Sequence, residues 1–271
     1  MAGNLPPSLE FPGRLVHVWP VRTAASKDVI SRLERVLAPD ERDRAARFRF
    51  GHLRDSFVVA RGALRIMLGR YLNTSAAGIQ FHYGSKGKPA LAASSPLHFN
   101  ASHSGGLAVF AFTAGCEIGV DVEQIRPLPD MQNVAARFFC REEAAELMSL
   151  TAGQREHAFF LCWTRKEAYI KATGDGLSAP LDDFRVTLQP GQPARFIHIA
   201  HDVNAAKEWS LSNIELAPDE LAPDELAPDE LAPDDLAPDY AAALAYRDAE
   251  RPVVVFPAMY PAELASITSS L

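Results

Sequence analysis

Two carboxylates in an alternating segment offer the clearest chemistry in this chain. Residues 118–123 read Ile-Gly-Val-Asp-Val-Glu, so apolar residues alternate with Gly119, Asp121 and Glu123. On a β-strand this alternation buries the three β-branched residues on one face and turns both carboxylates to the other. Two hard oxygen ligands on one face suit a divalent cation such as Mg²⁺. Taken alone, however, an Asp-x-Glu strand is most often the solvated face of a sheet.

A second segment, about forty residues later, has the spacing of a helix. Trp163, Glu167 and Lys171 recur at every fourth residue, with Lys166 between them. A helix stacks these side chains along one stripe. If this helix faces the strand, three carboxylates and two lysines converge, a group that suits Mg²⁺ and a phosphate-bearing substrate. Two plainer interpretations stay open. Lys166 could be a solvated neighbour of the site, and Trp163 could be a core anchor, which is the interpretation we favour for Trp163.

A third segment offers donors for an anion. Residues 99–106 read Phe-Asn-Ala-Ser-His-Ser-Gly-Gly and precede the apolar run 107–112. Paired glycines and small polar residues in a turn let backbone N–H groups approach an anion closely, and His103 adds a side-chain donor. The alternative is a hydrogen-bonded turn histidine without a ligand. The sequence has no Walker loop and no dinucleotide glycine signature, so phosphate binding falls to scattered groups.

Together, in this order and spacing, the three segments resemble the 4′-phosphopantetheinyl transferase superfamily, specifically its longer, two-halved type that serves peptide, polyketide and fatty-acid synthases. The family's motifs are matched by the Ser-His-Ser turn at 102–104, the strand at 119–123 and the helix at 163–171. The loop 83–89, Tyr-Gly-Ser-Lys-Gly-Lys-Pro, looks like the family's Gly-Lys-Pro loop. The resemblance runs from about residue 39 to 184, and more faintly to the end of the chain.

This resemblance implies a Mg²⁺-dependent enzyme, with Mn²⁺ as an alternative metal. Such an enzyme moves the phosphopantetheine arm of coenzyme A to a serine of an apo acyl or peptidyl carrier protein and releases 3′,5′-ADP. Metal binding would fall to Asp121, Glu123 and Glu167. Catalysis would fall to Glu167 and Lys171, with Glu167 either completing the metal shell or removing the serine proton. The residues implied for coenzyme binding are Arg44, Lys88, Ser102, His103 and Lys171.

Other interpretations use the same residues. A Mg²⁺-dependent pyrophosphate hydrolase would need these carboxylates and lysines, an activated water and no protein partner. A non-catalytic module that binds carrier proteins would tolerate the loss of Glu167 or of a metal carboxylate, yet all are retained. Arg44 lies in an arginine-rich stretch, 42–47, that is usually the solvated face of a surface helix.

The family's fold is α+β, with two similar halves packed as pseudo-twins about a twofold and the site between them. We expect a first half at 1–114 and a second at 115–271, which carries the metal site. The expected strands are 16–19, 79–83, 97–100, 107–113, 117–123, 184–188, 194–199, 209–214 and 240–246. The expected helices follow Ser26 and Pro39 and then span 54–72, 131–139, 141–150 and 155–173.

Composition and charge exclude several other classes. The chain of 271 residues is 48% hydrophobic, which is typical of a soluble protein of one or two domains, and no apolar run approaches a membrane span. Its N-terminus lacks the features of a secretion signal, so we expect a cytoplasmic monomer that does not bind a membrane. Three cysteines, odd in number and without metal spacing, are expected as buried free thiols: Cys116, Cys140 and Cys162.

A low-complexity insertion dominates the net charge. Residues 215–239 are five near-copies of Glu-Leu-Ala-Pro-Asp with ten acids and no base, so the rest of the chain carries +3 against −7 for the whole. The basic residues of the rest lack the aromatic interleaving of a nucleic-acid groove, so no nucleic acid is expected. A mildly basic body suits an acidic carrier protein and a polyphosphate substrate. Proline at every fifth position forbids a continuous helix across the insertion.

Overall fold

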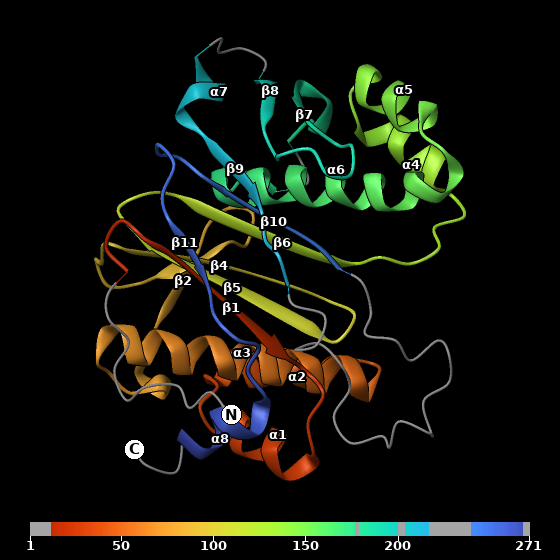
Figure 1. Ribbon diagram of the computed structural model, residues 1–271. Helices are drawn as coiled ribbons and strands as arrows, with labels where there is room; N and C mark the ends of the chain where they lie inside the picture. The colour runs from red at the N-terminus through yellow and green to blue at the C-terminus, as the bar shows by residue number, and fades with distance from the viewer. Residues whose placement is uncertain (1–11, 177–178, 200–203, 217–239, 268–271) are drawn as a thin grey trace.

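The computed structural model describes residues 12–176, 179–199, 204–216 and 240–267 of the chain. Two sheets stack face to face at its centre, and helices cover the outer face of each sheet (Figure 1). This helix, sheet, sheet, helix layering is an α+β architecture of two similar halves. Within the described ranges, no helix is long and apolar enough to cross a membrane.

The first half is built around a four-stranded sheet and one long helix. Its helices are α1 (Lys27–Glu34), α2 (Pro39–Ala46), α3 (Gly51–Leu72), the 3₁₀ turn η1 (Ala76–Gly78) and α8 (Pro261–Ile267). Its strands are β1 (Val16–Arg22), β2 (Phe81–Tyr83), β3 (Pro89–Leu91), β4 (Leu97–Ser104), β5 (Leu107–Ala114) and β11 (Val253–Val255). The main sheet runs β11-β1-β5-β4, while β2 and β3 form a separate hairpin. Helix α3 packs against the outer face of the main sheet.

The second half repeats this plan. Helix α6 (Ala152–Thr173) has 22 residues, the same length as α3, and covers a three-stranded sheet in the order β6-β10-β9. The sheet strands are β6 (Ile118–Gln124), β9 (Ser210–Asn213) and β10 (Tyr240–Tyr246). The remaining elements are α4 (Met131–Phe138), α5 (Arg141–Ser149), η3 (Leu181–Asp183), β7 (Phe184–Val186), β8 (Phe196–Ile199) and α7 (Ala205–Glu208).

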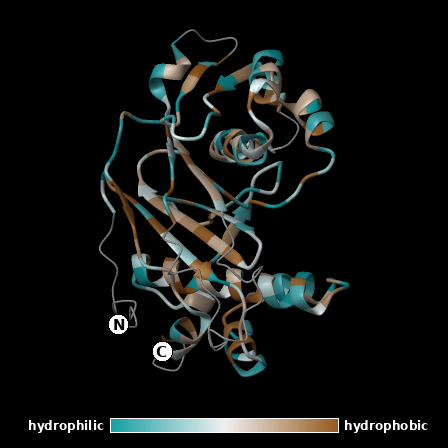
Figure 2. Ribbon diagram, turned by 45° about the vertical axis from the view of Figure 1, so that its right-hand side comes forward, coloured by the Kyte–Doolittle hydropathy of each residue, from teal (hydrophilic) through white to brown (hydrophobic). Residues whose placement is uncertain are grey.

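The central strands are apolar on both faces because each face meets another layer. In β5, Leu107, Val109 and Ala111 face the second sheet, while Phe110 and Phe112 face the helices of the first half. A strand buried on both faces needs a continuous apolar run rather than alternation, and residues 107–112 supply one. Figure 2 shows hydrophobic residues gathered on these central strands.

Gly119 sets the distance between strand β6 and helix α6. A Cβ atom at this position would lie 2.0 Å from the carbonyl oxygen of Ala168 and 2.4 Å from the backbone nitrogen of Ala172. Only glycine lets the strand and the helix backbone approach this closely. The glycine of the Gly-x-Asp-x-Glu motif is therefore a packing residue that brings β6 directly under α6.

Most predicted elements are confirmed, with corrections to the Ser-His-Ser segment, to two helix starts and to the list of elements. Ser102, His103 and Ser104 lie on strand β4 rather than in a turn, and their backbone pairs with β5; the turn itself is Gly105-Gly106. Helices α3 and α6 begin at Gly51 and Ala152 rather than at 54 and 155. Strands β3 and β11 and helices α7 and α8 were not anticipated, and β11 pairs in parallel with β1.

Cys116, Cys140 and Cys162 are free and buried, as predicted. The division at 114/115 stays a prediction; it falls at the turn between β5 and β6, while β11 and α8, from the end of the chain, pack with the first half. Most of the acidic insertion, 217–239, lies outside the described residues.

Candidate active site

Strand β6 turns its two carboxylates toward helix α6, as the alternation predicted. Ile118, Val120 and Val122 lie in the core between the two sheets. Asp121 and Glu123 share the opposite face with Gly119, against which α6 packs. Asp121 is almost fully buried, with 3% of its surface exposed.

Asp121 is held by one residue from each half of the molecule. Its Oδ1 accepts a hydrogen bond of 2.8 Å from the hydroxyl of Ser102 on β4 and lies 2.5 Å from the ammonium of Lys171 on α6. The same ammonium donates to the hydroxyl oxygen of Ser102 at 2.8 Å. Ser102, Asp121 and Lys171 thus form a closed triangle that joins the two halves.

Side chains of β4 also hold the rest of β6. The hydroxyl of Ser104 donates to Oε2 of Glu123 at 2.7 Å and accepts from the backbone N–H of Gln124 at 3.2 Å. Further along, the amide oxygen of Asn100 accepts from the backbone N–H of Val120 at 3.0 Å. Sequence reasoning missed Ser104 and Asn100. The sequence did contain a signal for Ser104, because the two serines and the two carboxylates have the same two-residue spacing.

The pKa of Glu167 is strongly raised in this group. Burial, together with the negative charges of Asp121 and Glu123 and despite the opposing charge of Lys171, raises its pKa to about 7. Burial also raises the pKa of Asp121, and that of Glu123, where the charge of Asp121 adds to the effect. These three carboxylates therefore influence one another electrostatically, and Glu167 titrates near neutral pH.

We tested whether these residues fit a metal ion. In the described ranges no three His, Cys, Asp or Glu side chains stand close enough together to hold one. Among the same residues, however, Oδ2 of Asp121 and Oε1 of Glu167 are buried without a hydrogen-bond partner. A buried, unpartnered carboxylate oxygen is costly unless a cation or water meets it. Hard oxygen donors of this kind fit Mg²⁺.

A cleft of about 430 Å³ opens beside Ser102 in the first half. Arg44, Arg61 and His103 line it together with Ser102 and an apolar wall. The apolar lining comes mainly from Phe48, Phe57, Leu64, Ala101, Ala108 and Phe110. Loss of solvent and the positive charges of Lys171 and Arg44 lower the pKa of His103. Arg61, which sequence reasoning missed, pairs with the buried Glu41 at 3.1 Å and donates to the hydroxyl of Tyr83 at 3.0 Å.

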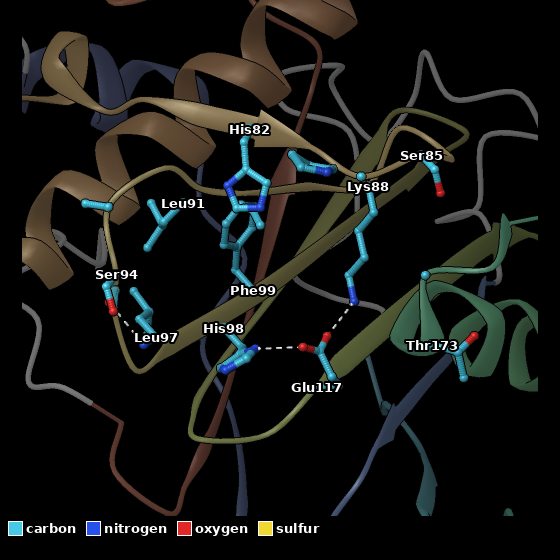
Figure 3. A pocket seen from close by; sticks show the side chains of 16 residues that line it. His82, Ser85, Lys88, Leu91, Ser94, Leu97, His98, Phe99, Glu117 and Thr173 are labelled. Atoms are coloured by element: carbon cyan, nitrogen blue, oxygen red, sulfur yellow. Dashed lines mark hydrogen bonds and ion pairs between the residues drawn. The ribbon is translucent and has the colours of Figure 1, made fainter.

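Lys88 is not among the residues that line this cleft with Arg44 and His103. Its ammonium donates to Glu117 at 3.0 Å and to the carbonyl oxygens of Ile118 and Ala172, and it lines a different cleft, of about 480 Å³ (Figure 3). The geometry therefore places Lys88 apart from Arg44 and His103, with which it was predicted to bind the coenzyme.

Lys166 and Trp163 have structural surroundings. Lys166 is fully buried, so its interpretation as a solvated neighbour is wrong, and it does not converge on the carboxylates. It pairs with Glu143 of α5 at 2.8 Å and donates to the carbonyl oxygens of Leu181 and Phe184. A one-residue step along a helix turns a side chain by about 100°, which carries Lys166 away from the face of Glu167. Trp163 packs among Phe138, Phe139 and Phe159, which confirms the core anchor.

Both parts of the chain match known protein families. Residues 117–232 match the 4′-phosphopantetheinyl transferase superfamily, and residues 23–115 match the N-terminal domain of 4′-phosphopantetheinyl transferase. The chain is 40% identical to the 4′-phosphopantetheinyl transferase HetI of Nostoc sp., over 79% of this chain and 87% of that protein. It is 32% identical to the 4′-phosphopantetheinyl transferase Sfp of Bacillus subtilis, over 62% of this chain and 74% of Sfp.

Among solved structures, the chain resembles the holo-[acyl-carrier-protein] synthase of Thermotoga maritima, with a TM-score of 0.34 and 18% identity, over 49% of this chain and 64% of that one.

Proposed function

The chain belongs to the 4′-phosphopantetheinyl transferase superfamily, and we propose that it moves the 4′-phosphopantetheine arm of coenzyme A to a serine of an apo acyl or peptidyl carrier protein. It is an enzyme, a 4′-phosphopantetheinyl transferase. The release of 3′,5′-ADP, the dependence on Mg²⁺ and the roles of individual residues are parts of the proposal.

One observation carries it: Ser102 lies at the junction of two sites with matching chemistry. Ser102 lines the cleft together with the arginines and His103, and its hydroxyl donates to Asp121 of the second half, beside Lys171. The cleft offers cations and an apolar wall, as a phosphorylated nucleoside such as the adenosine end of coenzyme A requires. Its pyrophosphate would then lie toward the carboxylates and Lys171.

In the proposed reaction, the hydroxyl oxygen of the carrier serine attacks the β-phosphorus of coenzyme A. The bond from that phosphorus to the bridging oxygen of the pyrophosphate breaks, and 3′,5′-ADP leaves. In one of the two roles proposed for Glu167, this carboxylate accepts the serine proton directly or through water; in the other it completes the metal shell. Lys171 turns from Asp121 to a phosphate oxygen and neutralises its charge.

Asp121, Glu123 and Glu167 would hold Mg²⁺, or Mn²⁺ in its place, and for this the three carboxylates would have to move closer together than they stand in the described structure. When bound, such an ion neutralises charge that builds up on the phosphate oxygens. The unpartnered oxygens of Asp121 and Glu167 are the observation that supports this assignment. Ser104 would keep Glu123 oriented toward the ion, because its hydrogen bond fixes one carboxylate oxygen.

The coenzyme would occupy the 430 Å³ cleft. Arg44 and His103 line it, which supports the roles proposed for them in coenzyme binding, and Arg61, which pairs with Glu41, lines the same wall. Arg44 also lies over the ring of Phe57, with its guanidinium carbon 5.2 Å from the ring centroid, which limits its conformations without neutralising its charge. A phosphate group of the coenzyme would meet these cations.

The test uses purified protein, coenzyme A, Mg²⁺ and a panel of apo carrier proteins. The intact mass of each carrier is measured along with 3′,5′-ADP. We expect one phosphopantetheine group on one serine of at least one carrier, and nucleotide release only when that carrier is present. Nucleotide release without any carrier would instead identify a pyrophosphate hydrolase. Carrier binding without mass gain or nucleotide would identify a non-catalytic module.

A further inference from the structure

Lys88 connects the first half to both site elements of the second. Its ammonium donates to Oε2 of Glu117 at 3.0 Å, to the carbonyl oxygen of Ile118 at 3.3 Å and to that of Ala172 at 2.8 Å (Figure 3). The first two acceptors lie at the beginning of strand β6. The third lies in the last turn of helix α6, next to Lys171, where carbonyl groups lack helical partners and favour a cation.

Glu117 is held from a second side. Nδ1 of His98 on β4 lies 3.4 Å from its Oε1, as Figure 3 shows. The hydrogen bond from His98 and the positive charge of Lys88 lower the pKa of Glu117 to about 2. The carboxylate is therefore ionised at neutral pH and is a full counter-charge for Lys88.

The backbone around Lys88 forms part of the coenzyme cleft. Lys88 lies at the end of the turn between β2 and β3, and its neighbours Gly87 and Pro89, with Tyr83, line the 430 Å³ cleft. The ammonium of Lys88 instead reaches the separate cleft beside Glu117 and Thr173. Lys88 thus lies between two residues that line one cleft, and its side chain cross-links this turn to the second half.

We propose that Lys88 is a positioning residue that clamps the β2–β3 hairpin, one wall of the coenzyme cleft, to the start of β6 and the end of α6. The clamp, which rests on the proposed function for its role in coenzyme binding, sets the distance between the bound coenzyme and the carboxylates. A direct contact between Lys88 and a coenzyme phosphate would require the ammonium to leave Glu117 and both carbonyl oxygens.

Three variants and a double variant test the clamp. Lys88→Met removes the ammonium and keeps an unbranched apolar stem, Glu117→Gln removes the counter-charge, and Lys86→Met is the matched control, an exposed lysine in the same turn. Amide hydrogen exchange is measured by mass spectrometry without coenzyme. We expect Lys88→Met and Glu117→Gln to speed exchange in residues 84–91 and 168–174, and Lys86→Met to leave both segments unchanged.

Coenzyme A binding and steady-state kinetics are measured as a second test of the clamp. We expect both variants to weaken coenzyme binding roughly 5–50-fold, and the double variant to be no weaker than the worse single variant, since the two residues act as a pair. The loss should appear in KM for the coenzyme more than in kcat, because Asp121, Glu167 and Lys171 are intact.

If Glu117→Gln leaves or improves coenzyme binding while Lys88→Met weakens it, Lys88 is a phosphate ligand and the clamp is overturned. Unchanged hydrogen exchange in both segments of Lys88→Met overturns it as well. Failure of the wild-type protein to bind coenzyme A would contradict the proposed function instead, and the exchange comparison, made without coenzyme, would still decide whether the clamp exists.

Discussion

The hydroxyl of Ser104 donates a hydrogen bond of 2.7 Å to Oε2 of Glu123, two residues along from the bond between Ser102 and Asp121. Strands β4 and β6 belong to different sheets, so no backbone ladder joins them. Their serine and carboxylate side chains make the connection at the point where the two halves meet. The Ser-x-Ser spacing thereby orients both carboxylates of the Asp-x-Glu strand.

Ser104→Ala tests this orientation. Loss of the hydroxyl frees one oxygen of Glu123 and removes a bond that opposes the rise of its pKa. Residues that orient metal ligands typically change metal affinity or activity by about 10–100-fold. We therefore expect the Mg²⁺ concentration at half-maximal rate to rise by about tenfold or more, measured by Mg²⁺ titration of the transfer rate. Ser104→Thr should restore it, and Ser94→Ala, an exposed serine, is the control. An unchanged titration in Ser104→Ala would refute the role.

Gly119→Ala tests the packing of β6 against α6. The new methyl group would collide with the backbone of Ala168 and Ala172, which a side-chain rotation cannot relieve. We expect a loss of at least about 2–3 kcal/mol in unfolding free energy, at the upper end of the cost of overpacking a core, and loss of transfer. Gly153→Ala, with open space at its Cβ, should be neutral or stabilising by about 0.4–1 kcal/mol. Urea unfolding of both variants decides this; equal stabilities would contradict the close approach.

The buried Glu167 predicts a pH-dependent stability of the metal-free protein. Its pKa in the folded state, about 7, lies above its ordinary value of 4.5, so folding favours the protonated form. This contribution is complete below pH about 4.5 and is lost as the pH rises through about 7. Relative to Glu167→Gln, the wild-type protein should therefore lose up to roughly 3 kcal/mol between these limits. Urea unfolding in chelator at several pH values measures the difference, and parallel curves for the two proteins would contradict it.

Deletion of residues 215–234 tests whether the acidic insertion is needed. Strands β9 and β10, on either side of it, pair directly, with Asn213 opposite Ala243, and the deletion retains one Leu-Ala-Pro-Asp copy to connect them. Loop length alters closure entropy by only ~0.6 kcal/mol per doubling. We expect a stability change of at most ~1–2 kcal/mol and unchanged transfer to two different apo carriers. Loss of transfer to only one of them would show that the insertion selects partners.

The face of each site element could be predicted because it follows from local periodicity. Alternation places Asp121 and Glu123 on one face of β6, and four-residue spacing places Glu167 and Lys171 on one face of α6. The strand and the helix need no distant partner to define these faces. The family motifs then indicated that the two faces meet.

The environments of Lys166 and Lys88 depend on residues far away in the chain. Lys166 can be buried because Glu143 neutralises its charge and two carbonyl oxygens accept its hydrogen bonds. Lys88 donates to the carbonyl oxygen of Ala172, which lies 84 residues later in the chain. Likewise, β11, near the end of the chain, pairs with β1, near its beginning. Local hydropathy and residue spacing do not predict such long-range pairings. From the sequence alone, a buried and fully paired lysine therefore cannot be distinguished from a solvated one.

The most direct test of the proposed activity is the intact mass of an apo carrier protein after incubation with coenzyme A and Mg²⁺. With the wild-type protein we expect a gain of one phosphopantetheine group. Asp121→Ala should give no gain, with its unfolding transition retained, and Glu167→Gln should slow the gain by ~10²-fold or more. A carrier that is modified at the wild-type rate by Asp121→Ala, or by the wild-type protein in excess chelator, would contradict the account.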